Sequence, residues 1–177
     1  MKKSIKGEKY NTLLSVKLSL LTLYLALTFP IPFFTIHNLK TISIFSFVFG
    51  ILLIISITND YVVISDISIS YKTSIISNLL GKKNWEIAWE DILKIKTFPT
   101  SQGSKVHYFV NNNGDSFLIP QRIEKFDEFN KIIETKTNLK NNFGVIAPLW
   151  TYKILTTLSI AIWVGEIIFI FLKGYQY

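Results

Sequence analysis

The sequence contains no cysteine among its 177 residues. This absence excludes disulfide bonds, thiolate metal sites and cysteine nucleophiles, and it leaves the redox compartment undecided. Charged residues are also scarce, because they make up 18% of the chain where soluble domains average about 25%. Since 49% of the residues are hydrophobic, we expect the charge to be missing in blocks.

The chain is also poor in the groups that catalysis needs. Its only histidines are His37 and His107, and the topology derived below separates them by a membrane. No H-E-x-x-H, G-x-S-x-G or phosphate-cradling glycine motif is present. Glu86, Glu90 and Asp91 are close in sequence, but two strands and a turn would point them in different directions. We therefore predict a protein that is not an enzyme and that binds no cofactor or metal.

The excess of positive charge lies at the N-terminus. The net charge is +7, and the first 17 residues hold five lysines against one glutamate, whereas the signs nearly cancel over residues 59–148. A nucleic-acid partner is therefore not expected, since no folded region carries the excess. Residues 1–17 are instead predicted to form a basic arm that binds anionic lipid headgroups. The lysines expected to contact lipid are Lys2, Lys3, Lys6 and Lys9.

Three apolar segments predict three transmembrane helices, so membrane lipids are expected partners. Residues 18–36 carry no charge, and at about 1.5 Å per residue they nearly cover a ~30 Å hydrocarbon core. Residues 41–58 form a second run, and residues 37–40 are predicted to be the loop of this 18–58 hairpin. A third helix is predicted at 149–172, with tyrosines and a tryptophan at its ends. A secretory signal peptide is the alternative for the first segment, but no A-x-A-like cleavage site follows it.

The lysine distribution sets the predicted orientation. The first hairpin loop has only Lys40 and the C-terminal tail only Lys173, so the lysine-rich arm should be cytoplasmic. This predicts a multi-pass protein with its N-terminus and the region between the second and third helices in the cytoplasm, and its C-terminus outside or in a lumen. The reversed topology remains the alternative.

The segment NWEIAWEDILKIK, residues 84–96, fits two templates. Its apolar residues recur at helical spacing, but Trp85, Ile87 and Trp89 also alternate as in a strand. Tryptophan and isoleucine within five residues favour a strand, and Glu90-Asp91 interrupt the apolar run. We predict a strand at 84–89, a turn at 89–91 and a strand at 92–98, with an amphipathic helix as the alternative.

The flanking segments also predict short antiparallel strands. In residues 60–72, apolar and polar residues nearly alternate on both sides of a possible turn at Ser65-Asp66. Strands at 106–111 and 115–119 flank Asn113-Gly114, which suits the positive φ angles of a type I′ turn. A helical face with charged residues opposite it then predicts one closing helix. The residues of that face are Phe126, Phe129, Ile132 and Ile133.

Three stretches carry a resemblance to the pleckstrin-homology-like (PH-like) domain of bacterial membrane proteins. They are ISDISISYKTSIISNLLGKKN, EIAWEDILKIK and FLIPQRIEKFDEFNKIIETKT. For residues 60–138 the resemblance implies a small half-open antiparallel β barrel capped by one C-terminal helix, without catalytic residues. It places Trp89 and Ile92 in or near the core with Asp91 holding the turn, and Phe129 joins this core from the closing helix. The predicted fold class is thus an α+β membrane protein.

The lipid site of the eukaryotic relatives does not carry over to this chain. That site is a basic loop between the first two strands, and here the loop is Ser65-Asp66. Lys82 and Lys83 lie on another loop, where they either touch lipid or form a solvated turn. In layout, a basic N-terminus, a helical hairpin and a β-rich domain are similar to a photosystem I assembly factor of cyanobacteria and chloroplasts, although this chain adds a third helix.

Glu166 is the one acidic residue within the apolar segments, and a charge at mid-helix costs about 2.5–3.5 kcal/mol on insertion scales. We expect a protonated Glu166 to donate a hydrogen bond toward Ser43, Ser46 and the carbonyl groups freed by Pro30 and Pro32. A wetted glutamate near the interface, ion translocation, and pigment or metal ligation are the alternatives.

Two functions are compatible with these observations. The first is a non-enzymatic membrane adaptor or assembly subunit whose PH-like domain binds a protein partner at the cytoplasmic face, with a photosynthetic (thylakoid) complex as one setting. The second is a component of a transport or lipid-handling system that uses Glu166. The oligomeric state is left open.

Overall fold

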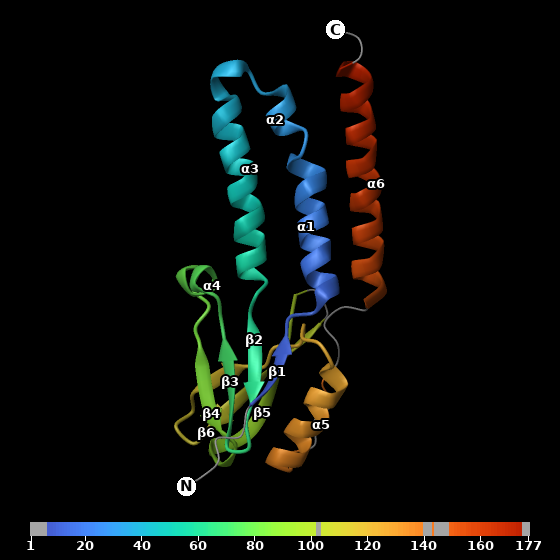
Figure 1. Ribbon diagram of the computed structural model, residues 1–177. Coiled ribbons are helices and arrows are strands. Elements are labelled where there is room, and N and C mark those ends of the chain that lie inside the picture. The colour runs from blue at the N-terminus through green and yellow to red at the C-terminus, as the bar shows by residue number, and fades with distance from the viewer. Residues whose placement is uncertain (1–6, 102–103, 140–142, 144–148, 175–177) are drawn as a thin grey trace. The chain divides into compact units, whose positions relative to one another are not determined.

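The computed structural model describes residues 7–101, 104–139, 143 and 149–174. The chain divides into two compact units, each built from two separate stretches of sequence. Residues 1–13 and 59–147 form the β unit, and residues 14–58 and 148–177 form the helical unit. Together the units contain three long apolar helices and two antiparallel sheets (Figure 1), which makes the fold α+β.

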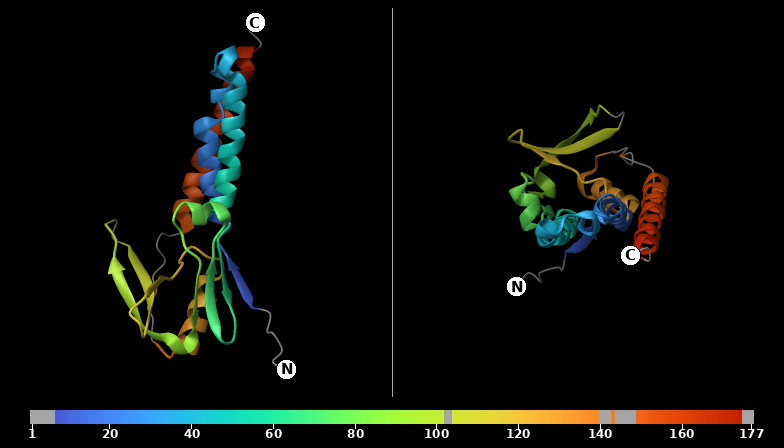
Figure 2. Two further views of the ribbon diagram at one scale, coloured as in Figure 1. Left: turned by 90° about the vertical axis from the view of Figure 1, so that its left-hand side faces the viewer. Right: turned by 90° about the horizontal axis from the view of Figure 1, so that it is seen from above.

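Among its described residues, the helical unit contains three helical segments that are long and apolar enough to cross a membrane. The second alone has 21 residues, or about 31 Å at 1.5 Å per residue. α1 lies between α3 and α6, as the front view and the view from above agree (Figures 1 and 2). The helices are α1 (Leu14–Thr28), α2 (Ile31–Phe34), α3 (His37–Ile57) and α6 (Leu149–Gly174).

The hairpin turn differs from the prediction. Residues 37–40 were expected to form the loop, but they are the first turn of α3. The chain instead leaves the helical conformation after Thr28 and again at Thr35–Ile36. Pro30 and Pro32 explain the first break, because a proline lacks the amide hydrogen that a continuing helix needs. α2 is the short helix that begins after Pro30.

The first sheet of the β unit has four strands in the order β1-β2-β3-β4. β1 comes from the segment that was expected to be a basic arm, and it pairs antiparallel with β2 over four residues. The turn predicted at Ser65-Asp66 is confirmed as the connection of β2 to β3. A short helix, α4 (Ile75–Leu79), follows β3. The strands are β1 (Glu8–Asn11), β2 (Tyr61–Ile64), β3 (Ser68–Lys72) and β4 (Trp85–Ala88).

The strand–turn–strand prediction for residues 84–96 is confirmed. β4 ends at Ala88, a 3-10 turn η1 (Trp89–Asp91) follows, and the next strand begins at Ile92. This strand starts the second sheet, whose order is β5-β6-β7. Its strands are β5 (Ile92–Pro99), β6 (Lys105–Asn111) and β7 (Ser116–Leu118).

The turn between β6 and β7 has the predicted position but not the predicted type. A type I′ turn needs a positive φ at both Asn113 and Gly114. Only Gly114 has one, at 86°. Its amide donates to the carbonyl oxygen of Asn111, and the Asn111 amide donates in turn to the carbonyl oxygen of Asp115. The loop therefore has three residues and ends on a left-handed glycine, a common hairpin form.

The two sheets pack face to face through aromatic side chains. The Trp85 ring of β4 lies 6.2 Å from Phe109 and 5.7 Å from Phe117, which belong to the second sheet. The closing helix, α5 (Phe126–Thr137), buries Phe129 and Ile133 in the same core. No strand pairing joins the two sheets within the described residues, so they do not form a closed barrel.

Candidate functional site

The residues predicted for the core of the β unit are buried. Trp89 and Ile92 are 7% and 8% exposed, and Phe129 is fully buried. Phe129 packs at 5.7 Å, edge to face, against Tyr10 of β1. Burial and then Glu8 raise the pKa of the Tyr10 hydroxyl. The core thus includes a side chain from the N-terminal segment that the prediction had left outside the domain.

Of the four lysines predicted to bind lipid headgroups, the structure describes one. Lys9 lies in β1, and its ammonium group is 3.9 Å from the centre of the Tyr61 ring on β2. Its backbone is part of the sheet and not of a free arm. Lys2, Lys3 and Lys6 lie outside the described residues.

The structure does not form the predicted cluster around Glu166. Ser43 donates its hydroxyl to the carbonyl oxygen of Lys40 on its own helix, and Ser46 is exposed on α3. The carboxyl oxygen Oε2 of Glu166 is buried without a hydrogen-bond partner among the described residues, and so is the indole nitrogen of Trp163. The cluster fails because α1 lies between the helix with the serines and the helix with Glu166.

A different serine provides the polar contact between helices. Ser19 of α1 is 2% exposed, and its hydroxyl oxygen lies 3.0 Å from the carbonyl oxygen of Tyr152 and 2.9 Å from the hydroxyl of Thr156, both on α6. Farther along, the Phe29 ring meets Trp163 edge to face at 5.8 Å. The sequence signal for Ser19 was a small polar residue in an apolar helix, which is typical of helix–helix interfaces in membranes.

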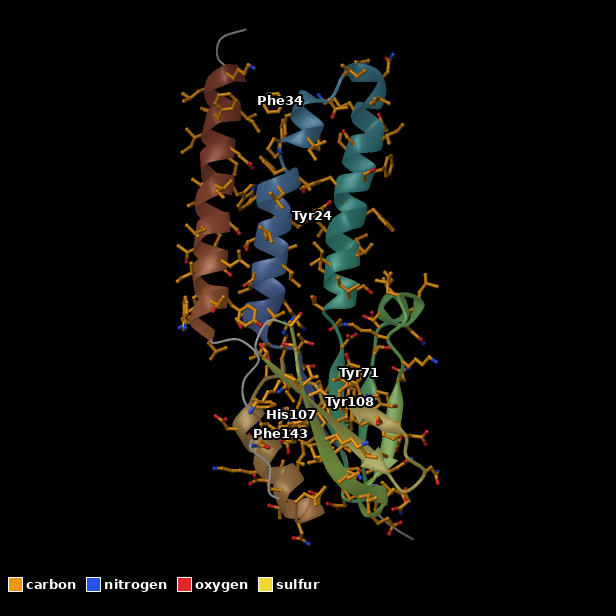
Figure 3. All side chains as sticks on the ribbon, turned by 180° about the vertical axis from the view of Figure 1, so that it is seen from behind. Tyr24, Phe34, Tyr71, His107, Tyr108 and Phe143 are labelled. Carbon is orange, nitrogen blue, oxygen red and sulfur yellow. The ribbon has the colours of Figure 1, made fainter. Side chains whose placement is uncertain are left out.

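On the other side of α1, Tyr24 fixes the contact with α3. Its side chain projects toward α3 (Figure 3), and its hydroxyl donates a 2.9 Å hydrogen bond to the carbonyl oxygen of Phe47. Gly50 leaves the space for this hydroxyl, because a Cβ there would overlap it. α1 therefore holds both neighbouring helices.

Asp60 is the centre of a polar cluster in the β unit that the sequence analysis missed. Its side chain is 5% exposed, and Oδ2 accepts a 2.6 Å hydrogen bond from the ammonium group of Lys82 and a 2.9 Å bond from the hydroxyl of Tyr71. Its Oδ1 accepts a 3.2 Å bond from the backbone amide of Ser74, which caps α4. The side chain of Asp60 thus connects the start of β2, the end of β3 and the α4 loop.

The electrostatics of this cluster favour a charged Asp60. Burial by itself would raise the pKa of the Asp60 carboxyl, but hydrogen bonds from Lys82, Ser74, Tyr71 and Ser77 together lower it. Burial and the neighbouring carboxylate raise the pKa of the Tyr71 hydroxyl, so this group keeps its proton and acts as a donor. The cluster therefore holds the α4 loop to the sheet, and the ammonium group of Lys82 is paired with Asp60 and not simply solvated. Lipid contact by Lys82 or Lys83 stays a prediction.

His107 is buried on β6 next to Phe143. The two rings are 4.6 Å apart (Figure 3), and Nδ1 of His107 is 2.8 Å from the hydroxyl of Thr97. Nε2 is buried without a hydrogen-bond partner in the described part of the chain. Burial, and secondly Lys105, lower the pKa of His107, so the imidazole is neutral in the folded unit.

The outer face of the second sheet carries the exposed side chains Phe98 and Leu118 and the half-buried Tyr108, which we together call the sheet-2 patch. Tyr108 is directly opposite Leu118 on one side and Lys96 on the other, and its ring is 5.8 Å from Phe98. Phe98 and Leu118 are about half exposed. The adjacent residues along the strands point the other way, because side chains alternate between the two faces of a sheet. These residues are Ile95, Phe109 and Phe117, which are paired across the three strands and face the core.

No group of three or more His, Asp or Glu side chains that could hold a metal ion occurs within the described ranges. Comparison with known proteins found no protein-family model that matches the chain. The chain is similar to an uncharacterized protein of the cyanobacterium Synechocystis, with 24% identity over 167 residues that cover 89% of this chain and 82% of the relative.

This distant similarity includes both units. Neither the β unit nor the helical unit alone makes up 89% of the chain, so the aligned region extends over both.

Proposed function

We propose that this chain is a non-enzymatic integral membrane adaptor or assembly subunit. In this proposal the helical unit holds the protein in the membrane and the β unit binds a protein partner. The sheet-2 patch is the observation that carries it. Phe98 and Leu118 are exposed, and with the half-buried Tyr108 between them they form an aromatic and aliphatic surface beside Lys96. Aromatic anchors with a charged rim are typical of protein interfaces, so we expect an apolar partner surface with acidic residues.

The architecture of the β unit supports a PH-like domain. Two antiparallel sheets pack through Trp85, and one amphipathic helix, α5, follows the last strand. This order agrees with the resemblance seen in the sequence. In the proposal the half-open arrangement is a rigid scaffold that presents loops and sheet faces to partners.

The pairing of β1 with β2 supports the proposed topology. These strands precede and follow the α1–α3 hairpin, and their pairing supports a topology with both ends of the hairpin on one side of the membrane. The lysine distribution then favours the cytoplasm for that side. α6 crosses once more, which leaves the C-terminus outside or in a lumen. The layout resemblance and the Synechocystis relative make a thylakoid complex the first place to search for the partner.

Affinity purification of the full-length protein from mild detergent tests the adaptor function. We expect a membrane complex to co-purify in stoichiometric amount with the wild type and to be lost with the double variant Phe98→Ser, Leu118→Ser. Both residues are about half exposed, so the variant should stay folded, with a lower thermal unfolding temperature because the contact of Phe98 with Tyr108 is lost.

The matched control is Ile67→Ser, because Ile67 is 74% exposed at the β2–β3 turn, away from the patch. This variant should recover the complex as well as the wild type does. Purification of a lone homo-oligomer, or equal recovery with both variants, would contradict the proposal.

A second candidate function is ion or proton transport, and one observation favours it. Glu166 Oε2 and Trp163 Nε1 are both buried in the helical unit without hydrogen-bond partners in the described residues. A transport role predicts pH-dependent flux in vesicles that contain only this protein, and loss of that flux with Glu166→Gln. If Glu166 instead fastens the helices, Gln should preserve their association while Glu166→Leu should weaken it.

A further inference from the structure

The short helix α4 has an inverted arrangement of polar and apolar side chains. Ile75, Leu79 and Leu80 are 89%, 87% and 66% exposed, whereas Ser77 is fully buried. The backbone amide of Ser74 joins the start of the helix to Asp60, and the Ser74 side chain caps the helix. The hydroxyl of Ser74 accepts a 3.1 Å hydrogen bond from the Ser77 amide. A surface helix of a soluble domain normally turns its apolar side chains inward, so this exposed group indicates a binding surface.

The Asp60 cluster keeps this apolar group close to the end of a membrane helix. The Asp60 carboxylate accepts from the Ser74 amide at the start of α4 and from Lys82 just beyond its end. Asp60 itself is three residues after Ile57, the last residue of α3. Three residues of extended chain reach at most about 11 Å. The short connection therefore limits how far Asp60, and the start of α4 that is bonded to it, can lie from the end of α3.

We propose that α4 docks into the surface of the membrane that α3 crosses. Ile75, Leu79 and Leu80 enter the boundary between headgroups and acyl chains, and Lys83 faces anionic headgroups. Lys83 is exposed next to Lys82, whose ammonium group is already held by Asp60. The docking needs α3 to span a membrane, but it does not depend on the protein partner proposed above.

The absence of cysteine allows a direct test with single spin labels in the full-length protein. The label positions are Leu79→Cys on α4, Ile67→Cys as the water-exposed control, and Phe45→Cys as the lipid-exposed control on α3. All three residues are more than two-thirds exposed, so a label should not disturb the fold. The protein is placed in nanodiscs of phosphatidylcholine with phosphatidylglycerol, one copy in each disc, which removes partner proteins and second copies.

The measurement is the collision rate of each label with oxygen and with a water-soluble nickel complex. We expect the Leu79 label to collide with nickel several-fold less often than the Ile67 label, with the Phe45 label lower still. Ile75→Cys should repeat the result. The docking would be wrong if the Leu79 label were as accessible to nickel as the Ile67 label while the Phe45 label stayed protected. That result would leave the membrane span of α3 unchallenged.

Two further experiments distinguish the membrane from a second protein chain as the surface that covers α4, and they test the role of Lys83. Protection of the Leu79 label that appears only in discs with two copies would assign the surface to a second chain and overturn the proposal. Removal of phosphatidylglycerol should raise the nickel accessibility at Leu79, and Lys83→Gln should have the same effect with the anionic lipid present. If neither change has an effect, Lys83 does not face anionic headgroups.

Discussion

Trp89 donates its indole hydrogen to the backbone carbonyl oxygen of Ser65, at 2.9 Å. Its own amide donates to the carbonyl oxygen of Ile67 at 3.1 Å. The two bonds connect the turn between β4 and β5 to the turn between β2 and β3, two segments that are more than twenty residues apart. One buried tryptophan therefore fixes both turns at the point where the first sheet passes into the second.

Trp89→Ala should destabilise the β unit strongly. Truncation of a buried tryptophan typically costs about 3–5 kcal/mol, a large part of the stability of a small domain. Trp89→Phe keeps most of the apolar contact and loses the hydrogen bond, which is worth about 0.5–1.5 kcal/mol. Denaturant unfolding of the full-length protein, followed by near-UV circular dichroism, should rank the variants in this order. Lys83→Ala, at an exposed position, is the control, and equal losses for Trp89→Ala and Lys83→Ala would refute the assignment.

The N-terminal strand should be required for folding of the β unit. A fragment that starts at residue 60 lacks β1 and therefore Tyr10. The Tyr10 side chain is 1% exposed and packs against Phe129. We expect this fragment to be unfolded, and a version with residues 7–13 joined to its start by a flexible linker to be folded. Amide hydrogen exchange distinguishes the two. Tyr10→Ala in the linked version should again abolish protection, and slow exchange in the short fragment would show that β1 is dispensable.

The stability of the β unit should fall in mild acid because of His107. Its pKa is lowered in the folded state from an ordinary 6.5, so the unfolded chain binds more protons below that pH. The stabilisation is therefore complete above about pH 6.5 and is lost as the pH falls toward the lowered folded value. Thermal unfolding between about pH 7.5 and 5.5 measures this loss. His107→Gln should flatten the dependence, whereas His37→Gln, in the helical unit, should leave it unchanged.

Ser19 should matter more for the helical unit than its size suggests. Ser19→Ala removes the polar contact with Tyr152 and Thr156, and such bonds in membrane proteins average about 0.6 kcal/mol. Ser19→Leu adds bulk at a position that is 2% exposed, where overpacking costs about 1–3 kcal/mol. Unfolding in mixed micelles with increasing dodecyl sulfate should show both effects. Thr157→Leu is the matched control, because Thr157 is exposed and bonds only within its own helix.

Local sequence patterns predicted those elements whose conformation depends mainly on their own residue types. The β4–η1–β5 segment followed from Trp85, Ile87 and Trp89, because alternating aromatic and β-branched residues suit a strand regardless of distant contacts. The exact turn after β6 did not follow, since Asn-Gly suits several loops and the strand pairing selects one. Here the pairing left Asn113 at negative φ and gave only Gly114 a positive one.

Long-range pairing explains what the sequence could not show. β1 is four residues of mixed character, and its partner β2 is some fifty residues away, so no local signal marks it as a strand. Asp60 is a single acidic residue after an apolar run, and only the fold brings Tyr71, Ser74 and Lys82 around it. Glu166 was noticed because it is acidic in an apolar helix, but its partners depended on which helix lies in the middle.

The interrupted β unit sets an order of events during biosynthesis. β1 leaves the ribosome first, yet its partner β2 is made only after α1, α2 and α3. If the hairpin crosses a membrane as proposed, the strand must wait, unpaired, until the hairpin has inserted and brought β2 back to the same side. A hairpin that inserts with only one crossing would leave β1 and β2 on opposite faces, and the β unit would not fold. Quality-control proteases that remove unfolded domains would then also remove wrongly inserted chains.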